Sequence, residues 1–223
     1  MNIAIIVAAG SGSRFGAEKP KQFLEICGKP LLIHTLERFE NSSIIDEIIL
    51  VLASEEIENF QTTLEKFNLY KVKRIIAGGE TRAESVLNAI NSLNKMQVEF
   101  VAVHDGARPF VSTEEITQTI EKARETGACC LVGKVTDTIK RVANGKIVET
   151  IDRETLRRAQ TPQTFRFEIL QQAFASENFD AMASDECFLV EKAGFAVAFV
   201  EGSAKNIKIT TREDFMVAEI YLK

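Results

Sequence analysis

The chain has 223 residues, a formal net charge of −5 and four cysteines, and 45% of its residues are hydrophobic. This length and composition predict one globular domain with a full core, and they exclude a low-complexity or disordered chain. The negative charge argues against a nucleic-acid-binding or membrane-surface protein, so we expect no nucleic acid and no membrane among its partners. A polyanionic ligand would therefore need a local cationic pocket.

The four cysteines have neither a C-x-x-C pair nor the spacing of a zinc site; they are Cys27, Cys129, Cys130 and Cys187. The N-terminal segment lacks the basic region that begins a signal peptide, and no stretch approaches the roughly twenty apolar residues of a membrane span. We therefore expect a cytoplasmic protein in which the cysteines are small core residues.

The first predicted element is a short apolar run at residues 3–8, closed by Gly10. Such a run, rich in β-branched residues, is typical of a strand buried on both faces of a parallel sheet. Similar runs recur along the chain at residues 47–51, 72–77, 100–104, 128–132 and 195–200.

Helical patterns lie between these runs. Residues 113–126 have apolar side chains at helical spacing, a capping box of Ser112 and Glu115 at their start, and Gly127 at their end. Residues 82–93 show a similar pattern with a capping box at their start. Strands that alternate with helices predict an α/β fold with an open, mostly parallel, Rossmann-like sheet and helices on both faces. In such sheets ligands bind beyond the carboxyl ends of the strands.

One segment interrupts this alternation. Residues 138–142 and 146–151 are two β-patterned runs around Asn144 and Gly145, the strongest short hairpin signal. We expect a β-arm inserted at about 136–156 into a single domain that spans the whole chain. Its narrow apolar face either folds over its own sheet or pairs with another subunit, and the second is favoured because the α/β layers are complete without it.

The loop after the first strand has the composition of a phosphate site. Residues 8–16 are A-A-G-S-G-S-R-F-G, followed by K-P-K-Q at 19–22. It is neither a Rossmann fingerprint, because Phe15 stands where the third glycine belongs, nor a Walker loop. Glycines let backbone N–H groups approach phosphate oxygens, and Arg14 and Lys21 add positive charge. A plain glycine-serine loop is the alternative interpretation, which the two cations make less favourable.

The A-A-G-x-G-x-R and P-K-Q motifs resemble the signature of the sugar-phosphate nucleotidyltransferases. Within that group, the chain is similar over nearly its whole length to the 2-C-methyl-D-erythritol 4-phosphate cytidylyltransferases. The other motifs that carry this resemblance lie at residues 78–86, 103–109, 136–140, 151–153, 161–163 and 206–208. It implies a nucleotidyltransferase sheet with a dimerisation arm, in an enzyme of the non-mevalonate isoprenoid pathway. That enzyme joins CTP to 2-C-methyl-D-erythritol 4-phosphate, giving 4-diphosphocytidyl-2-C-methyl-D-erythritol and pyrophosphate.

Catalytic and binding roles follow from the resemblance alone. It implies that Arg14 and Lys21 stabilise the transition state at the α-phosphorus, and that Arg153 and Lys208 hold the acceptor's phosphate. Thr138 would also touch the acceptor. Because Thr138 and Arg153 lie on the arm, they would reach the site of a partner subunit in a homodimer. The nucleotide site would comprise Ala8, Ala9, Gly10, Gly12, Gly79, Glu80, Ser85 and Asp105.

The resemblance also implies a cofactor, Mg²⁺ or another divalent cation, beside Asp105. The acceptor's phosphate oxygen would attack the α-phosphorus in line while pyrophosphate leaves. Such a reaction needs positioned charge rather than a side-chain nucleophile, and the sequence shows no Ser-His-Asp or Cys-His set.

Two other functions stay open. The ribitol 5-phosphate cytidylyltransferases share the fold and several motifs, so the acceptor could be ribitol 5-phosphate. A catalytically silent nucleotide-binding subunit could use the same fold, although a binding module would not need cations on both sides of a reacting phosphorus.

Several residues near these motifs have ordinary interpretations. Arg82 and Ser85 begin a helix, so they either bind an anion or are first-turn residues. We expect Arg108 to pair with a carboxylate and His104 to be structural. The acidic pair that begins with Asp185 is expected in a solvated first turn of a helix.

Overall fold

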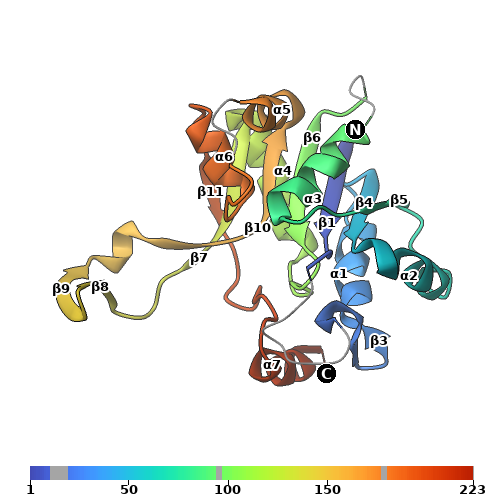
Figure 1. Ribbon diagram of the computed structural model, residues 1–223, viewed down its shortest axis with the longest axis horizontal. Helices are drawn as coiled ribbons and strands as arrows, with labels where there is room; N and C mark the ends of the chain where they lie inside the picture. The colour runs from blue at the N-terminus through green and yellow to red at the C-terminus, as the bar shows by residue number, and fades with distance from the viewer. Residues whose placement is uncertain (11–19, 94–96, 177–179, 223) are drawn as a thin grey trace.

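The computed structural model describes residues 1–10, 20–93, 97–176 and 180–222 (Figure 1). Its centre is a seven-stranded sheet with the order β11-β7-β10-β6-β1-β4-β5. All neighbouring strands are parallel except β10, which runs antiparallel to β6 and to β7. The strands are β1 (Asn2–Val7), β4 (Glu47–Leu52), β5 (Val72–Ala77), β6 (Phe100–Asp105), β7 (Ala128–Lys134), β10 (Arg157–Arg166) and β11 (Ala198–Glu201). The predicted α/β fold with a mostly parallel sheet is confirmed.

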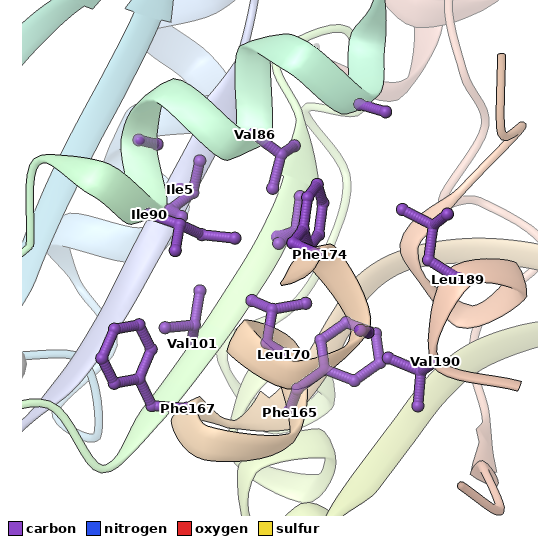
Figure 2. Close-up of a cluster of buried hydrophobic side chains, with 14 of the residues drawn as sticks. Ile5, Val86, Ile90, Val101, Phe165, Phe167, Leu170, Phe174, Leu189 and Val190 are labelled. Atoms are coloured by element: carbon purple, nitrogen blue, oxygen red, sulfur yellow. The ribbon is translucent and has the colours of Figure 1, made fainter. Parts of the chain in front are cut away.

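Each face of the sheet carries its own hydrophobic core, since successive side chains of a strand point to opposite faces. In β1, Ile3 and Ile5 belong to one core, whereas Ala4 and Ile6 belong to the other. The first core, shown in Figure 2, is covered by α3 (Arg82–Asn91), α5 (Phe167–Ala175) and α6 (Glu186–Lys192). The second is covered by α1 (Leu31–Glu40), α2 (Ile57–Leu64) and α4 (Thr113–Thr126).

The elements with strong local signals form as predicted. Helix α4 has both halves of the Ser112 and Glu115 capping box, and Gly127 ends it in the left-handed region at φ 87°. Strand β11 begins three residues later than its apolar run suggests. The backbone N–H of Phe195 donates to the carbonyl of Val190 at the end of α6, so the start of that run belongs to the helix terminus instead.

The central strand β10 is an element that the sequence patterns missed. It pairs with both of its neighbours, yet its middle contains the polar residues Gln160, Thr161 and Gln163 together with Pro162. The register of its pairing with β7 shifts between Ala159 and Gln163. Proline cannot donate to a ladder, so an irregular stretch is where an interior strand can hold one.

The predicted hairpin is present as β8 (Ile139–Ala143) and β9 (Lys146–Ile151). Both turn residues, Asn144 at φ 49° and Gly145 at φ 73°, have the positive φ that a type I′ turn requires. Figure 1 shows this arm projecting away from the sheet. Three apolar side chains near its tip are exposed, Val142 by 67%, Ile147 by 66% and Val148 by 56%, so the arm does not fold over its own sheet.

The remaining described elements are two short strands, the C-terminal helix and three 3-10 helices. The short strand β2 (Glu25–Ile26), which pairs with β3 (Lys29–Pro30), and the helix α7 (Arg212–Leu222) contribute to a third, smaller apolar cluster. Three 3-10 helices complete the described chain at Lys21–Phe23, Ser54–Glu56 and Arg153–Thr155. In the described residues, none of the helices has the length and apolar character needed to cross a bilayer.

Candidate functional site

A cavity of about 480 Å³ lies beyond the carboxyl ends of β1, β5 and β6. This is the edge at which an open parallel sheet binds its ligands. Most of the nucleotide-site residues that the sequence suggested meet here, together with the two cations Lys21 and Lys208. The lining residues are Val7, Ala8, Ala9, Gly10, Lys21, Gln22, Gly79, Glu80, Thr81, Arg82, Ser85, Asp105, Ala107 and Lys208.

Four predicted residues are not part of this lining. Arg14 and Gly12 lie outside the described residues. Thr138 immediately precedes the first strand of the exposed arm, and Arg153 begins the 3-10 helix that follows its last strand. The guanidinium of Arg153 donates to the Thr136 carbonyl over 2.6 Å, so within this chain it is bound to the base of the arm and not to the cavity.

Gln22 fixes the loop that follows β1. Its side chain is only 4% exposed, and its amide nitrogen donates to the carbonyls of Ala8 at 2.8 Å and Gly10 at 3.0 Å. Because Gln22 follows Lys21 in the same 3-10 helix, these bonds also fix the backbone that carries Lys21. The sequence pointed to Gln22 only through the P-K-Q motif and suggested no role for it.

The loop after β5 leads into the N-terminus of α3, which opens onto the cavity. Thr81 caps the helix with a complete capping box, and the hydroxyl of Ser85 accepts from the Gly79 N–H at 3.1 Å. A Cβ atom on Gly78 would lie 2.5 Å from the Cβ of Ala9 and 2.8 Å from the Ser85 hydroxyl. The loops after β1 and β5 can therefore approach this closely only because residue 78 is glycine.

Asp105, at the end of β6, is the electrostatic centre of the site. Its carboxylate oxygens lie 3.2 Å from Arg82 Nη2, 3.3 Å from Arg108 Nε and 2.9 Å from Lys208 Nζ. Burial alone would raise the pKa of Asp105, but the three cations hold it well below its usual range. Asp105 is therefore ionised, and the prediction that Arg108 pairs with a carboxylate is confirmed.

A second buried carboxylate, Glu186, stands behind Arg82. The prediction that Asp185 and Glu186 form a solvated first turn is wrong for Glu186, which is 1% exposed and pairs with Arg82 Nη1. Asp185 caps α6 by accepting from the Phe188 N–H at 3.0 Å. The turn is buried because the amide of Gln163, in the strand that the sequence patterns missed, is bonded to it.

His104 is structural, as predicted. It is completely buried, and its Nε2 lies 3.0 Å from the Arg108 carbonyl while its Nδ1 lies 3.0 Å from the Thr161 hydroxyl. A carbonyl can only accept, so Nε2 carries the proton and Nδ1 accepts from Thr161. Burial lowers the pKa of His104 to about 4, which keeps the ring neutral.

The cavity therefore combines small residues and backbone with convergent charge. Lys21, Arg82 and Lys208 bring cations to its wall, and Glu80 and Asp105 bring carboxylates. Cations and a helix N-terminus around one small volume suit a polyphosphate, and the lone buried carboxylate suits a cation that accompanies it.

Comparison with known protein families agrees with this geometry. The family model described as IspD, 2-C-methyl-D-erythritol 4-phosphate cytidylyltransferase, matches residues 2–223. A protein of that name from Bacillus licheniformis is 44% identical over 225 residues, covering 100% of this chain and 96% of the relative. Another of that name, from Alkaliphilus metalliredigens, is 46% identical over 218 residues, covering 96% of this chain and 90% of the relative.

Solved structures show the same similarity. The 4-diphosphocytidyl-2C-methyl-D-erythritol synthase from Anaerococcus prevotii superposes with a TM-score of 0.85 at 32% identity, covering 100% of this chain and 96% of that one. The 2-C-methyl-D-erythritol 4-phosphate cytidylyltransferase from Thermus thermophilus gives a TM-score of 0.77 at 30% identity, covering 98% of this chain and 97% of that one.

Proposed function

Because the chain belongs to the 2-C-methyl-D-erythritol 4-phosphate cytidylyltransferase family, we propose that it transfers CMP from CTP to 2-C-methyl-D-erythritol 4-phosphate and releases pyrophosphate. It is a nucleotidyltransferase of the isoprenoid pathway that this family serves. The observation that carries the proposal is the cavity in which Lys21, Asp105 and Lys208 meet beside the N-terminus of α3.

The chemistry follows from the charges around the cavity. An oxygen of the acceptor's phosphate attacks the α-phosphorus, the bond from that phosphorus to the bridging oxygen breaks, and pyrophosphate leaves with the electron pair. Both reactants are anions, so the site must neutralise charge and align the attacking oxygen. Lys21 serves the transferring phosphorus together with Arg14, and Lys208 serves the acceptor's phosphate.

A divalent cation, Mg²⁺ in our proposal, fits Asp105 in a limited way. Mg²⁺ in phosphoryl-transfer sites is commonly held by one or two carboxylates and by the substrate's own phosphates. Asp105 supplies one ionised carboxylate at the cavity wall, with Glu80 as a second carboxylate along the lining. Within the described residues there is no cluster of three metal-ligating side chains, so the nucleotide would supply most of the ligands. The cation would offset the charge of the triphosphate.

We further propose that the active enzyme is a homodimer in which the arm of each subunit completes the partner's site. The support is that Arg153 and Thr138 lie outside the cavity of their own chain, at the base of a hairpin with exposed apolar side chains. An isolated two-stranded hairpin is only marginally stable in water, so a partner surface would stabilise it. The proposed location is the cytoplasm, supported by four cysteines that are all unpaired.

A heterodimer distinguishes exchange of the arm from action within one chain. One subunit carries Lys21→Ala and the other Arg153→Ala, and two different affinity tags allow the mixed dimer to be isolated. With exchanged arms, one of its two sites is intact, so about half of the wild-type turnover is expected. If each arm served its own chain, both sites would carry one defect, and at acceptor concentrations far below the KM of Arg153→Ala the mixed dimer would lose most of its turnover.

The acceptor is tested by competition. Purified protein is incubated with CTP, Mg²⁺ and equal concentrations of 2-C-methyl-D-erythritol 4-phosphate and ribitol 5-phosphate, and both products are quantified. We expect 2-C-methyl-D-erythritol 4-phosphate to be used at least about tenfold faster, a difference of about 1.4 kcal/mol in transition-state stabilisation. A preference for ribitol 5-phosphate would overturn the proposal, and absence of both products would favour the silent nucleotide-binding subunit.

A further inference from the structure

The guanidinium of Arg82 is occupied on two sides. Its Nε and Nη2 both lie 3.2 Å from Asp105 Oδ1, and its Nη1 is bonded to Glu186 Oε1. Arg82 therefore bridges a carboxylate that lines the cavity and a carboxylate that does not. Its side chain is 21% exposed, whereas that of Glu186 is 1% exposed.

Glu186 is held rigidly from behind. Its backbone N–H donates to the side-chain oxygen of Gln163 at 3.0 Å, as does that of Cys187 at 3.1 Å. The nitrogen of the same amide donates to Asp185 at 2.9 Å. Gln163 is itself 1% exposed in the central strand β10, so one amide fastens the first turn of α6 to the middle of the sheet.

Glu186 is also an unusual residue to bury at this place. Its Oε1 faces Arg82, while its Oε2 has no hydrogen-bond partner within the described residues. Burial raises its pKa above the usual range, although Arg82 opposes this. A buried carboxylate with one unsatisfied oxygen is costly to the fold, so a functional benefit at the site would explain its presence.

The benefit lies in the charge balance around Asp105. Three cations, Arg82, Arg108 and Lys208, surround the carboxylate of Asp105. Without another carboxylate nearby, this positive charge would make Asp105 a poor ligand for a divalent cation. Glu186 shares Arg82 with Asp105 and offsets part of that positive charge. Because Arg82 pairs with both carboxylates, its electrostatic interaction with Asp105 is weaker than it would be if Asp105 were its single partner.

We propose that Glu186 is a positioning residue that acts through Arg82, leaving Asp105 oriented and sufficiently negative to bind the cation that accompanies the nucleotide. The inference deepens the proposed function and rests on it. Glu186 does not line the cavity, and its effect reaches the cavity only through the guanidinium of Arg82.

The test compares CTP binding with and without Mg²⁺ by isothermal titration calorimetry. In Glu186→Gln the pocket gains positive charge, so the metal-free affinity for CTP stays the same or rises. The extra affinity that Mg²⁺ confers falls about tenfold, and turnover falls by a similar factor, because the side chain that contacts Asp105 loses its second carboxylate. Glu191→Gln is the matched control, because Glu191 is an exposed carboxylate on the same helix.

A merely structural role for Glu186 would give a different pattern. CTP affinity would then fall equally with and without Mg²⁺, and that result, or an unchanged gain from Mg²⁺, would overturn the inference. The second arm is a double-mutant cycle with Arg82→Met. When Arg82 is absent, Glu186→Gln is expected to change the Mg²⁺ gain no further, and an additive loss would show that Glu186 does not act through Arg82.

Two controls keep this test separate from the proposed function. Wild-type protein that binds CTP but does not transfer CMP would overturn the proposed function, while the calorimetry would still decide the role of Glu186. Thermal unfolding checks that each variant is folded. If Glu186→Gln does not fold, Glu186→Asp tests the same step, since it keeps the charge but shortens its reach. It is then expected to lose part of the Mg²⁺ gain, and an undiminished gain would contradict the inference.

Discussion

Lys208 Nζ lies 2.9 Å from Asp105 Oδ2, so the lysine proposed to hold the acceptor's phosphate is bound to the carboxylate proposed to face the cation. Lys208 is 38% exposed on its side chain, whereas Asp105 is 9% exposed. The lysine is therefore the partner that can move. Binding of a cation at Asp105 would release Lys208 toward the cavity, because the cation replaces its charge at the carboxylate.

We expect Lys208→Ala to raise the KM for the acceptor at least about tenfold, because one charge-assisted contact to the phosphate is lost. The KM for CTP should change much less. Steady-state kinetics with each substrate varied in turn measure both values. Lys205→Ala is the control, since Lys205 does not line the cavity. Equal changes in both KM values would contradict the assignment of Lys208 to the acceptor.

Lys21→Ala should fold normally and lose at least about a hundredfold in kcat, because a cation aimed at the transferring phosphorus acts mainly in the transition state. Single-turnover rates at saturating substrates check this loss, and circular dichroism checks the fold. Lys29, a half-buried lysine on the nearby β3 that pairs with Glu37, provides the matched variant Lys29→Ala. Wild-type turnover in Lys21→Ala would remove Lys21 from the mechanism.

Arg153→Ala should raise the acceptor KM while calorimetric CTP binding stays nearly normal, since the proposed contact of Arg153 is with the acceptor's phosphate. Arg141→Ala removes an arginine from the same arm, one that pairs with Glu149 at 2.7 Å, and it should leave the acceptor KM unchanged. The role of Arg153 would be refuted by an unchanged acceptor KM in Arg153→Ala, or by an equal increase in both variants.

Because His104 is buried in its neutral form, we expect the protein to lose stability in mild acid. The unfolded chain protonates this histidine near pH 6.5, whereas the folded chain does so only near its pKa of about 4. Stability therefore falls as pH falls from about 6.5 to about 4, by about 3 kcal/mol at most. Urea unfolding across this range should show a shallower dependence in His104→Gln, which keeps a donor for the Arg108 carbonyl. Parallel curves for the two proteins would contradict the prediction.

Gly78→Ala should lower the free energy of unfolding by about 1–3 kcal/mol, because its Cβ would press against Ala9 and Ser85. Both neighbours line the cavity, so CTP affinity should fall as well. Gly10→Ala is the comparison, since no described atom lies within 4 Å of its added Cβ; its stability should change by no more than about 0.5 kcal/mol. Thermal unfolding that ranks the two variants in the opposite order would refute the close-packing argument.

The parts of the fold that the sequence predicted are those with local signals. Helix α4 could be placed to the residue because its capping box and Gly127 mark both ends. Strand β10 could not, because its polar residues are satisfied only by distant partners: Thr161 bonds to His104, and Gln163 bonds to the first turn of α6. A pattern of apolar residues does not indicate a strand stabilised in this way.

The same distinction holds for the site. The glycine-rich loop and Asp105 could be predicted because they end strands, where ligands bind. The burial of Glu186 could not, because an acidic pair at a helix start is usually solvated, and its partner Arg82 lies 104 residues away. The placement of Arg153 in the site of a partner subunit was implied by the family resemblance and stays a prediction.

The arm leaves the body from β7 and β10, two neighbouring strands inside the sheet, and the sheet has its helices and cores on both faces without the arm. If the arms are exchanged between subunits as proposed, folding of a chain and completion of its site would be separate equilibria. Under the proposed exchange of arms, diluting the enzyme would lower its specific activity while its circular dichroism and its CTP cavity stayed intact. The cell could then set the flux through this enzyme by its concentration as well as by its substrates.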